Sequence, residues 1–230
     1  MAKPSRRNKQ LTLVQDERPK QPTRAGPLKL LTEAQRVYAS SIRANPLTFS
    51  CGSAGVGKDY VALAIAAEML ERGDIQQITL VRPLVETGAS MGAFPGTVEE
   101  KLAPWMIPML DILVERLGRG TTDYYVKAGK IKVVPLALMR GSTLKGAFVL
   151  LTEAQNTTPK QMEMFLTRIG DDAKVVVDGD HHQSDVRGKN GLEDALARLE
   201  DVPGVGMVEF FPEDCVRSGL CRAILERYES

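Results

Sequence analysis

The sequence predicts an α/β fold of three layers, in which helices flank both faces of a mainly parallel β-sheet. From residue 31 onward, short apolar segments alternate with longer amphipathic segments, the pattern of strands that alternate with helices. Several apolar segments, such as residues 147–152, are continuously apolar, as is typical of strands covered on both faces. A glycine-rich turn joins the first apolar segment to the helix that follows it.

The expected elements follow from these patterns and from signals at their ends. Thr32 and Thr158 each stand three residues before a glutamine and predict capped helix starts, and Pro159 suits a first helical turn. The expected strands span residues 47–51, 76–82, 131–135, 147–152, 173–178 and 206–210. The expected helices span residues 32–44, 58–72, 97–117, 159–169, 190–200 and 213–228. Ligand-binding residues are expected directly after the strands, where parallel strands share one edge of the sheet.

The turn after the first strand reads G-x-x-x-x-G-K from Gly52 to Lys58, the pattern of a Walker A phosphate loop. Its backbone N–H groups and the helix N-terminus would converge on a phosphate, and the Lys58 ammonium would reach the terminal phosphates. Asp59 stands where Ser or Thr is usual. A glycine-rich turn without a ligand is the alternative. The residues expected to contact the nucleotide here are Gly52, Ser53, Ala54, Gly55, Val56, Gly57, Lys58, Asp59 and Tyr60.

Polar residues also follow two later strands of the expected sheet. Glu153 comes after strand 147–152 and is the best candidate to orient or deprotonate an attacking water. Strand 173–178 leads into Gly-Asp and then Gln183, which we interpret as a reader of the γ-phosphate. The alternatives are a solvated acid at a strand end and an ordinary Gly-Asp turn.

Three arginines and one glutamine complete the candidate residues. Arg82 and Arg140 follow expected strands, where they would hold polynucleotide phosphates, contact a neighbouring subunit or form surface salt bridges. Arg217, at the start of the last expected helix, is a candidate arginine finger or a charge on a helix surface. Gln35, in the first expected helix, would recognise adenine through its amide or serve only in the helix cap.

Composition bounds the possible function classes. The chain has 230 residues, of which 43% are hydrophobic, enough for one domain over residues 31–230. Residues 1–30 hold eight Lys or Arg against two acids, so we expect a disordered basic arm that contacts nucleic acid or solubilises the protein. No segment approaches the ~20 apolar residues that a membrane span needs. No secretory signal is recognisable, so a cytoplasmic location is expected.

Cysteine and histidine usage indicates neither disulfides nor a zinc site. The three cysteines have no metal-ligand spacing, and the only two histidines, His181 and His182, are adjacent. We expect both histidines to be loop residues rather than ligands.

A series of segments, taken in order, resembles the PhoH-like proteins. Beside the phosphate loop they are Arg82-Pro83-Leu84-Val85-Glu86, Phe94-Pro95-Gly96, Glu99-Glu100-Lys101, Met139-Arg140-Gly141-Ser142-Thr143-Leu144, Glu153-Ala154-Gln155-Asn156-Thr157-Thr158, Gln161-Met162 and Met164-Phe165-Leu166-Thr167-Arg168. The resemblance covers residues 30–228, and the lone core without a nuclease domain is similar to phage-encoded and short bacterial members. It implies a P-loop NTPase of RecA-like type, similar to half of a superfamily 1 helicase, with ATPase activity, a role in RNA metabolism and hexameric rings.

The chain departs from the family pattern at three positions around the phosphates. The family has Thr, Asp and usually Thr where this chain has Asp59, Thr152 and Asp178. A carboxylate and a hydroxyl are thus exchanged between the first two positions, so we expect Asp59 and Thr152 to address Mg²⁺ together. The alternative is a degenerate site in which Asp59 repels the β-phosphate.

The leading hypothesis is an Mg²⁺-dependent ATPase linked to RNA or other nucleic-acid metabolism. Lys58, Glu153 and Gln183 would act on the phosphates, and Arg217 would reach across a subunit boundary of a homo-oligomer. The rivals are a catalytically weak nucleotide-binding switch or assembly protein and, with less support, a small-molecule kinase. We expect no membrane partner, and a host cytoplasm if the protein is phage-encoded.

Overall fold

The computed structural model describes residues 25–83, 98–180, 183, 188–217, 219–220 and 227, with the side chains of residues 98–105 excepted. The strands are β1 (Leu47–Cys51), β2 (Gln77–Arg82), β3 (Ile131–Pro135), β4 (Ala147–Leu151), β5 (Lys174–Gly179) and β6 (Val205–Glu209). The helices are α1 (Glu33–Ala44), α2 (Lys58–Arg72), α3 (Val98–Leu117), α4 (Arg119–Lys127), α5 (Pro159–Leu166) and α6 (Gly191–Leu199). Short 3₁₀ turns η2 (Leu136–Met139), η3 (Ala154–Asn156) and η4 (Pro212–Asp214) follow three of the strands.

The described strands form one parallel sheet in the order β3-β2-β4-β5-β1-β6. Strand β5 lies between β1, which leads into the glycine-rich turn, and β4, which leads into Glu153. This insertion of a strand between those two is the RecA-like arrangement of a P-loop NTPase. All the strands end at the same edge, so the segments that follow β1, β4 and β5 meet there.

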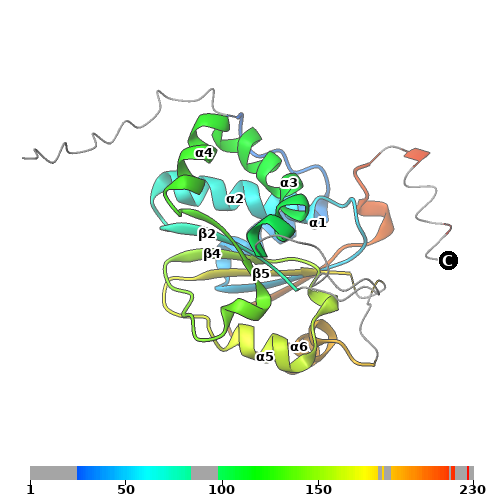
Figure 1. The fold of residues 1–230 in the computed structure, drawn as a ribbon. Helices are drawn as coiled ribbons and strands as arrows, with labels where there is room; N and C mark the ends of the chain where they lie inside the picture. Colours follow the sequence, from blue (N-terminus) through cyan, green and yellow to red (C-terminus); the bar gives the residue numbers. More distant parts are fainter. Residues whose placement is uncertain are drawn as a thin grey trace, which may run out of the picture.

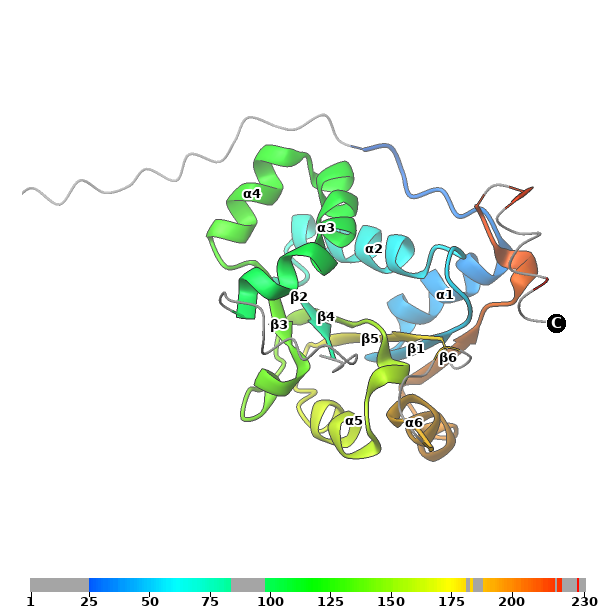
Figure 2. The same cartoon turned by 45° about the vertical axis from the view of Figure 1, so that its right-hand side comes forward.

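Helices cover both faces of the sheet, as the two views show (Figures 1 and 2). Helices α1, α2 and α3 pack on one face around Leu63, Ile78 and Phe148, and α4 packs on α3. Helices α5 and α6 cover the other face around Phe49 and Phe165. Helices on both faces explain why β1 and β4 are fully buried along their length, and β4 is continuously apolar.

The expected strands agree with the observed ones within one or two residues at each end. Two helices differ from expectation. Helix α4 was not predicted, because its nine residues are mostly polar and include Gly120. It begins after Gly118, and the Thr122 hydroxyl donates to the Leu113 carbonyl at 3.2 Å. Helix α5 ends at Leu166, three residues earlier than expected, where the Thr167 hydroxyl bonds to the last-turn carbonyl of Glu163 at 2.9 Å.

The ends of the chain also differ from expectation. Residues 1–24 of the expected basic arm lie outside the described residues, but residues 25–30 do not. Leu28 and Leu30 pack against the core, and the Arg116 guanidinium donates to the Gly26 carbonyl at 3.0 Å, so the packed chain begins before the boundary at residue 30. Half of the residues in the helix expected over 213–228 lie outside the described part. Its start is wrong, because Cys215 and Val216 follow a 3₁₀ turn without helical structure.

Candidate functional site

The glycine-rich segment between β1 and α2 has the geometry of a phosphate loop. Gly52 has φ +139°, and a Cβ there would lie 2.4 Å from the Phe210 carbonyl oxygen, so only glycine fits this close approach. Gly57 has φ +86° and forms the N-terminal cap of α2, whose first N–H groups face the loop. The Lys58 ammonium donates to the carbonyls of Gly52 at 2.5 Å and Ser53 at 2.9 Å. The sequence therefore folds into a cradle with a cation at its centre.

A cavity of about 470 Å³ opens beside this loop at the carboxyl edge of the sheet. It brings together most of the residues predicted from the sequence: Ala54, Gly55, Gly57, Lys58, Asp59, Tyr60, Thr152, Glu153, Gln183 and Arg217. Gly52 and Ser53 lie beneath it as acceptors of the Lys58 ammonium, and Val56 is buried. Asp178, which the sequence analysis placed near the phosphates, also lines it. The lining residues to which the sequence analysis gave no role are Gln155, Gly179, Asp180 and Val216.

Asp59, Thr152 and Asp178 bring oxygen atoms into this cavity that lack hydrogen bonds. Asp59 Oδ1, Thr152 Oγ1 and Asp178 Oδ1 are buried, and no described group forms a hydrogen bond with any of them. Asp178 Oδ1 lies 3.7 Å from the Lys58 ammonium, whose charge partly compensates its burial. No described cation is paired in this way with Asp59 Oδ1 or Thr152 Oγ1. Burying unsatisfied oxygens is unfavourable unless a cation or donor meets them. Their chemistry, carboxylate and hydroxyl oxygen, is the chemistry that Mg²⁺ prefers.

Among the described residues, no group of three or more acidic, histidine or cysteine side chains is placed to hold a metal ion. A site with few protein ligands suits Mg²⁺, which keeps several waters and takes oxygens from bound phosphates. The unsatisfied oxygens of Asp59 and Thr152 fit an Mg²⁺ ion of this kind.

Burial dominates the electrostatics of the site. It raises the pKa of Asp178 well above the usual carboxyl value; the Lys58 ammonium opposes the shift, and the charge of Asp59 adds to it. Burial, with Asp178 as the next cause, also raises the pKa of the Cys51 thiol to about 12. Cys51 therefore remains a neutral thiol and is no nucleophile at neutral pH.

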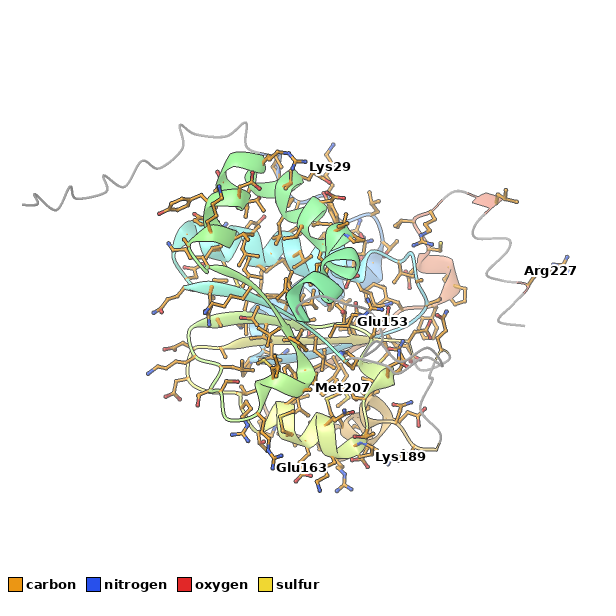
Figure 3. The ribbon with its side chains drawn as sticks, in the orientation of Figure 1. Lys29, Glu153, Glu163, Lys189, Met207 and Arg227 are labelled. Carbon is orange, nitrogen blue, oxygen red and sulfur yellow. The ribbon has the colours of Figure 1, made fainter. Side chains whose placement is uncertain are left out.

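Glu153 is held in a strained conformation at the end of β4. Its backbone is left-handed, with φ +54° and ψ +38°, which costs about 1–3 kcal/mol for a residue other than glycine. One carboxylate oxygen accepts a hydrogen bond from the Gln155 amide at 2.8 Å, and the other lies 3.5 Å from the Arg82 guanidinium. Figure 3 labels Glu153 at the edge of the sheet, and Glu163 and Lys189 on the side of α5 and α6.

Gln155 is a positioning residue that the sequence reasoning missed. It is 2% exposed, and its amide oxygen accepts the Asp180 N–H at 3.1 Å while its amide nitrogen donates to Glu153. A Cβ at Gly179 would lie 2.8 Å from the same amide oxygen, so glycine is required for this approach. Two features of the sequence could have indicated this role: Gln155 stands two residues after Glu153, and Gly179 ends the next strand.

Arg217 lies against the phosphate loop of its own chain. A Cβ at Gly55 would be 2.8 Å from Arg217 Cδ and Nε, and the neighbouring Val216 N–H donates to the Gly55 carbonyl at 3.1 Å. The segment after β6 folds back over the loop and places Arg217 there. The expected action of Arg217 across a subunit boundary remains a prediction. Its side chain lines the same cavity as Lys58.

Gln35 supports the loop from beneath. It is 3% exposed; its amide nitrogen donates to the Val56 carbonyl at 2.8 Å, and its amide oxygen accepts the Leu31 N–H at 2.7 Å. The amide thus bridges the N-terminal segment and the phosphate loop, and Gln35 does not line the cavity. Recognition of adenine by Gln35 remains a prediction.

The other predicted positions lie outside the cavity or outside the description. Arg82 ends β2 and does not line the cavity, and Arg140 is exposed after η2. His181 and His182 lie outside the described residues. A larger cavity of about 610 Å³ lies between α5 and α6, but no residue of the phosphate loop lines it.

Comparison with known proteins identifies the family. The PhoH-like protein family matches residues 27–229. This chain belongs to that family. It is 44% identical over 206 residues to Protein PhoH of Escherichia coli K12, covering 88% of this chain and 58% of that protein. It is 43% identical over 204 residues to the PhoH-like protein of Bacillus subtilis, covering 88% of this chain and 64% of that protein. The chain thus spans about three fifths of the length of these relatives.

Among solved structures, the chain is similar to the Pif1 helicase of Candida albicans, with a TM-score of 0.41 and 15% sequence identity. The match covers 80% of this PhoH-like chain and 40% of the helicase chain. No helix within the described ranges has the length and apolar character to cross a bilayer.

The raised pKa of Asp178 predicts a pH dependence of stability. The folded chain keeps this proton to higher pH than the unfolded chain, so the free energy of unfolding should fall as the pH rises above about 4 through the folded pKa. Asp178→Asn cannot titrate and should remove part of this fall. Urea unfolding with EDTA at a series of pH values measures it, with exposed Asp123→Asn as the control. An unchanged pH dependence in Asp178→Asn would contradict the assignment.

Proposed function

We propose that this PhoH-like chain binds ATP at the phosphate loop and hydrolyses it with Mg²⁺. The observation that carries the proposal is the shared cavity, in which Lys58 and the α2 N-terminus face the same space as Glu153. A cation, a helix N-terminus and glycine-permitted backbone together form a phosphate site. The Glu153 carboxylate, after β4, can orient or deprotonate the water that hydrolysis needs in addition to phosphate binding.

Each residue of the cavity has a role in this proposal. The loop backbone and Lys58 hold the phosphates, Glu153 orients or deprotonates the attacking water, and Gln183 hydrogen-bonds to the terminal phosphate. Gln183 is supported by its place on the cavity wall, where its N–H donates to the Asp180 carbonyl at 3.1 Å. Tyr60 lies on the wall too, with its hydroxyl bonded to Glu115 at 2.7 Å.

Asp59, Thr152 and Asp178 would hold Mg²⁺ in this proposal. When bound, the ion neutralises the charge that develops on the phosphates. The unsatisfied buried oxygens of Asp59 and Thr152 support the exchange of a carboxylate and a hydroxyl between the two positions. Asp178 adds a second buried carboxylate, which Lys58 partly compensates.

A catalytically weak nucleotide-binding switch is the alternative, and one observation favours it. Asp59, in the first turn of α2, places a negative charge where the phosphates would approach the helix N-terminus. A link to RNA or other nucleic acid, and assembly into a ring, are further parts of the proposal. Residues 1–30 contain eight basic residues and two acids, and this positive charge supports the link to nucleic acid.

The Lys58 ammonium should dominate nucleotide binding. Removing a charge-assisted contact of this kind should weaken ATP binding about ten- to hundredfold and abolish most turnover in Lys58→Ala. Titration with a fluorescent ATP analogue and a phosphate-release assay measure the two effects. Exposed Lys132→Ala should match the parent in both. Equal binding and turnover in Lys58→Ala would refute the proposed function.

The exchange of metal ligands predicts coupling between Asp59 and Thr152. Asp59→Thr should need more Mg²⁺ and turn over more slowly, because the ion then loses one of its two carboxylate ligands and keeps only Asp178, which Lys58 partly compensates. The double variant Asp59→Thr with Thr152→Asp should recover activity beyond the sum of the single changes, by about 0.5–3 kcal/mol of coupling. Mg²⁺ titrations of turnover for the four proteins measure this. Faster turnover by Asp59→Thr alone would instead indicate a degenerate site.

We further propose that Arg217 acts on the nucleotide of its own chain. Its contact with Gly55 and its place on the cavity wall support this. Arginine fingers contribute about 10³–10⁵ in kcat, so Arg217→Ala should lose at least about tenfold. Mixtures of Arg217→Ala and Lys58→Ala should show no rescue, since each chain would need both residues. Rescue in mixed oligomers would show instead that the arginine acts across a subunit boundary.

A further inference from the structure

Thr152 and Asp178 lie side by side at the carboxyl edge of the sheet. Leu151 of β4 is paired with Val177 of β5, so the two residues that follow this pair are also neighbours. Side chains two residues apart in a strand point to the same face, and Val176, two residues before Asp178, packs in the apolar cluster that includes α2. Thr152 and Asp178 therefore lie on the face that α2 covers, and both line the cavity beside the phosphate loop.

Asp59, in the first turn of α2, adds a second carboxyl group next to that of Asp178. Burial is the largest cause of the raised pKa of Asp178, and the charge of Asp59 and a side-chain contact with it add to the shift, so the two carboxyl groups are close together. Lys58 is the described cation paired with Asp178, and its ammonium also donates to the carbonyls of Gly52 and Ser53. Two carboxyl groups thus share one ammonium that is already engaged by the loop.

Thr152 is the residue that indicates a missing ligand most directly. It is 4% exposed and lines the cavity, yet its Oγ1 forms no hydrogen bond with any described group. Asp59 Oδ1 is buried and lacks a hydrogen bond in the same way. Buried oxygens of this kind are unfavourable unless a donor or a cation meets them. The three side chains therefore form a site that a bound group completes.

A hard divalent cation is the group whose chemistry fits this site. Mg²⁺ and Mn²⁺ take oxygen ligands, and Mg²⁺ is held through one or two carboxylates while it keeps several waters. A phosphate loop of the usual kind supplies only a Ser or Thr hydroxyl at the position of Asp59. With Asp59 and Asp178 together, two protein carboxylates can balance the charge of the ion before any phosphate is present, and Thr152 adds a neutral oxygen.

We propose that Asp59, Thr152 and Asp178 bind Mg²⁺ or Mn²⁺ in the absence of nucleotide, and that this cation has to be in place before ATP binds tightly. Asp59 puts negative charge at the N-terminus of α2, where the phosphates approach, and a bound cation offsets that charge. This inference rests on the proposed ATP-binding function and gives the order in which the site fills, cation first and ATP second. No covalent bond changes in either step.

The first test measures cation binding without nucleotide. The full chain, stripped of metal with EDTA and desalted at mildly alkaline pH, is titrated with Mn²⁺, and the electron paramagnetic resonance signal of free Mn²⁺ reports how much is bound. One equivalent should bind, and Mg²⁺ should displace it. Asp59→Asn keeps the size of the side chain but removes its charge, so it should weaken Mn²⁺ binding at least about tenfold. Thr152→Val removes a neutral ligand and should weaken binding less.

Two further variants show whether the cation binds where we propose. Asp74→Asn removes an exposed acid just beyond the other end of α2, and it should bind Mn²⁺ as the parent does. Lys58→Ala should keep Mn²⁺ binding while it loses ATP binding, because the ammonium is not a ligand of the cation. Circular dichroism checks that each variant is folded.

The second test measures binding of a fluorescent ATP analogue in EDTA and then with Mg²⁺. Without a divalent cation, the parent should bind weakly, and Asp59→Asn should bind about two- to tenfold more tightly than the parent, because a nearby negative charge has gone. Added Mg²⁺ should strengthen binding by the parent much more than binding by Asp59→Asn.

Two outcomes of these tests would overturn the inference. They are a parent that binds no Mn²⁺ without nucleotide, and an Asp59→Asn protein that binds Mn²⁺ as tightly as the parent. Lys58-dependent binding of ATP in either case would leave the proposed function intact. Absence of any Lys58-dependent ATP binding would overturn both, because the order of filling presupposes that ATP binds at this loop.

Discussion

Parallel pairing of β5 with β1 on one side and β4 on the other sets the position of every charged group in the site. Phe49 of β1 lies opposite Val177 of β5, and Leu151 of β4 lies opposite the same residue. Strands β1 and β5 therefore end level with each other and β4 ends two residues earlier, so the residues that follow these strands meet at one edge. A shift of one residue in this register would turn Asp178 away from Lys58 and place an apolar side chain there instead.

The site contains buried charged and polar groups that destabilise the folded chain, and the rest of the fold compensates for this cost. Asp178 is buried beside Lys58, and the carboxyl keeps a raised pKa despite that cation. Two further oxygens, on Asp59 and Thr152, are buried without hydrogen bonds. Two apolar layers, one on each face of the sheet, supply the stability that permits this arrangement. Groups of this kind are typical of sites that complete their coordination only when a ligand binds.

Backbone strain and hydrogen bonding act together at Glu153. A left-handed glutamate is unfavourable, yet the Gln155 amide and the Arg82 guanidinium meet its two oxygens and stabilise one orientation. Because Gln155 also accepts the Asp180 N–H after β5, Glu153 and the segment that leads to Gln183 share one support at the sheet edge.

Sequence patterns alone determined the alternating elements, the phosphate loop and the acid after β4, because these depend on local periodicity and on glycine spacing. They also identified Asp59 and Thr152 as a changed pair. Only the tertiary structure decided what depends on contacts between distant segments: the Gln35 bridge to Val56, the Gln155 link, the Arg82–Glu153 pair, and Arg217 against its own Gly55. Helix α4 belongs with these, since packing on α3 rather than propensity stabilises it. Local signals set what each segment becomes, and strand order sets which side chains meet.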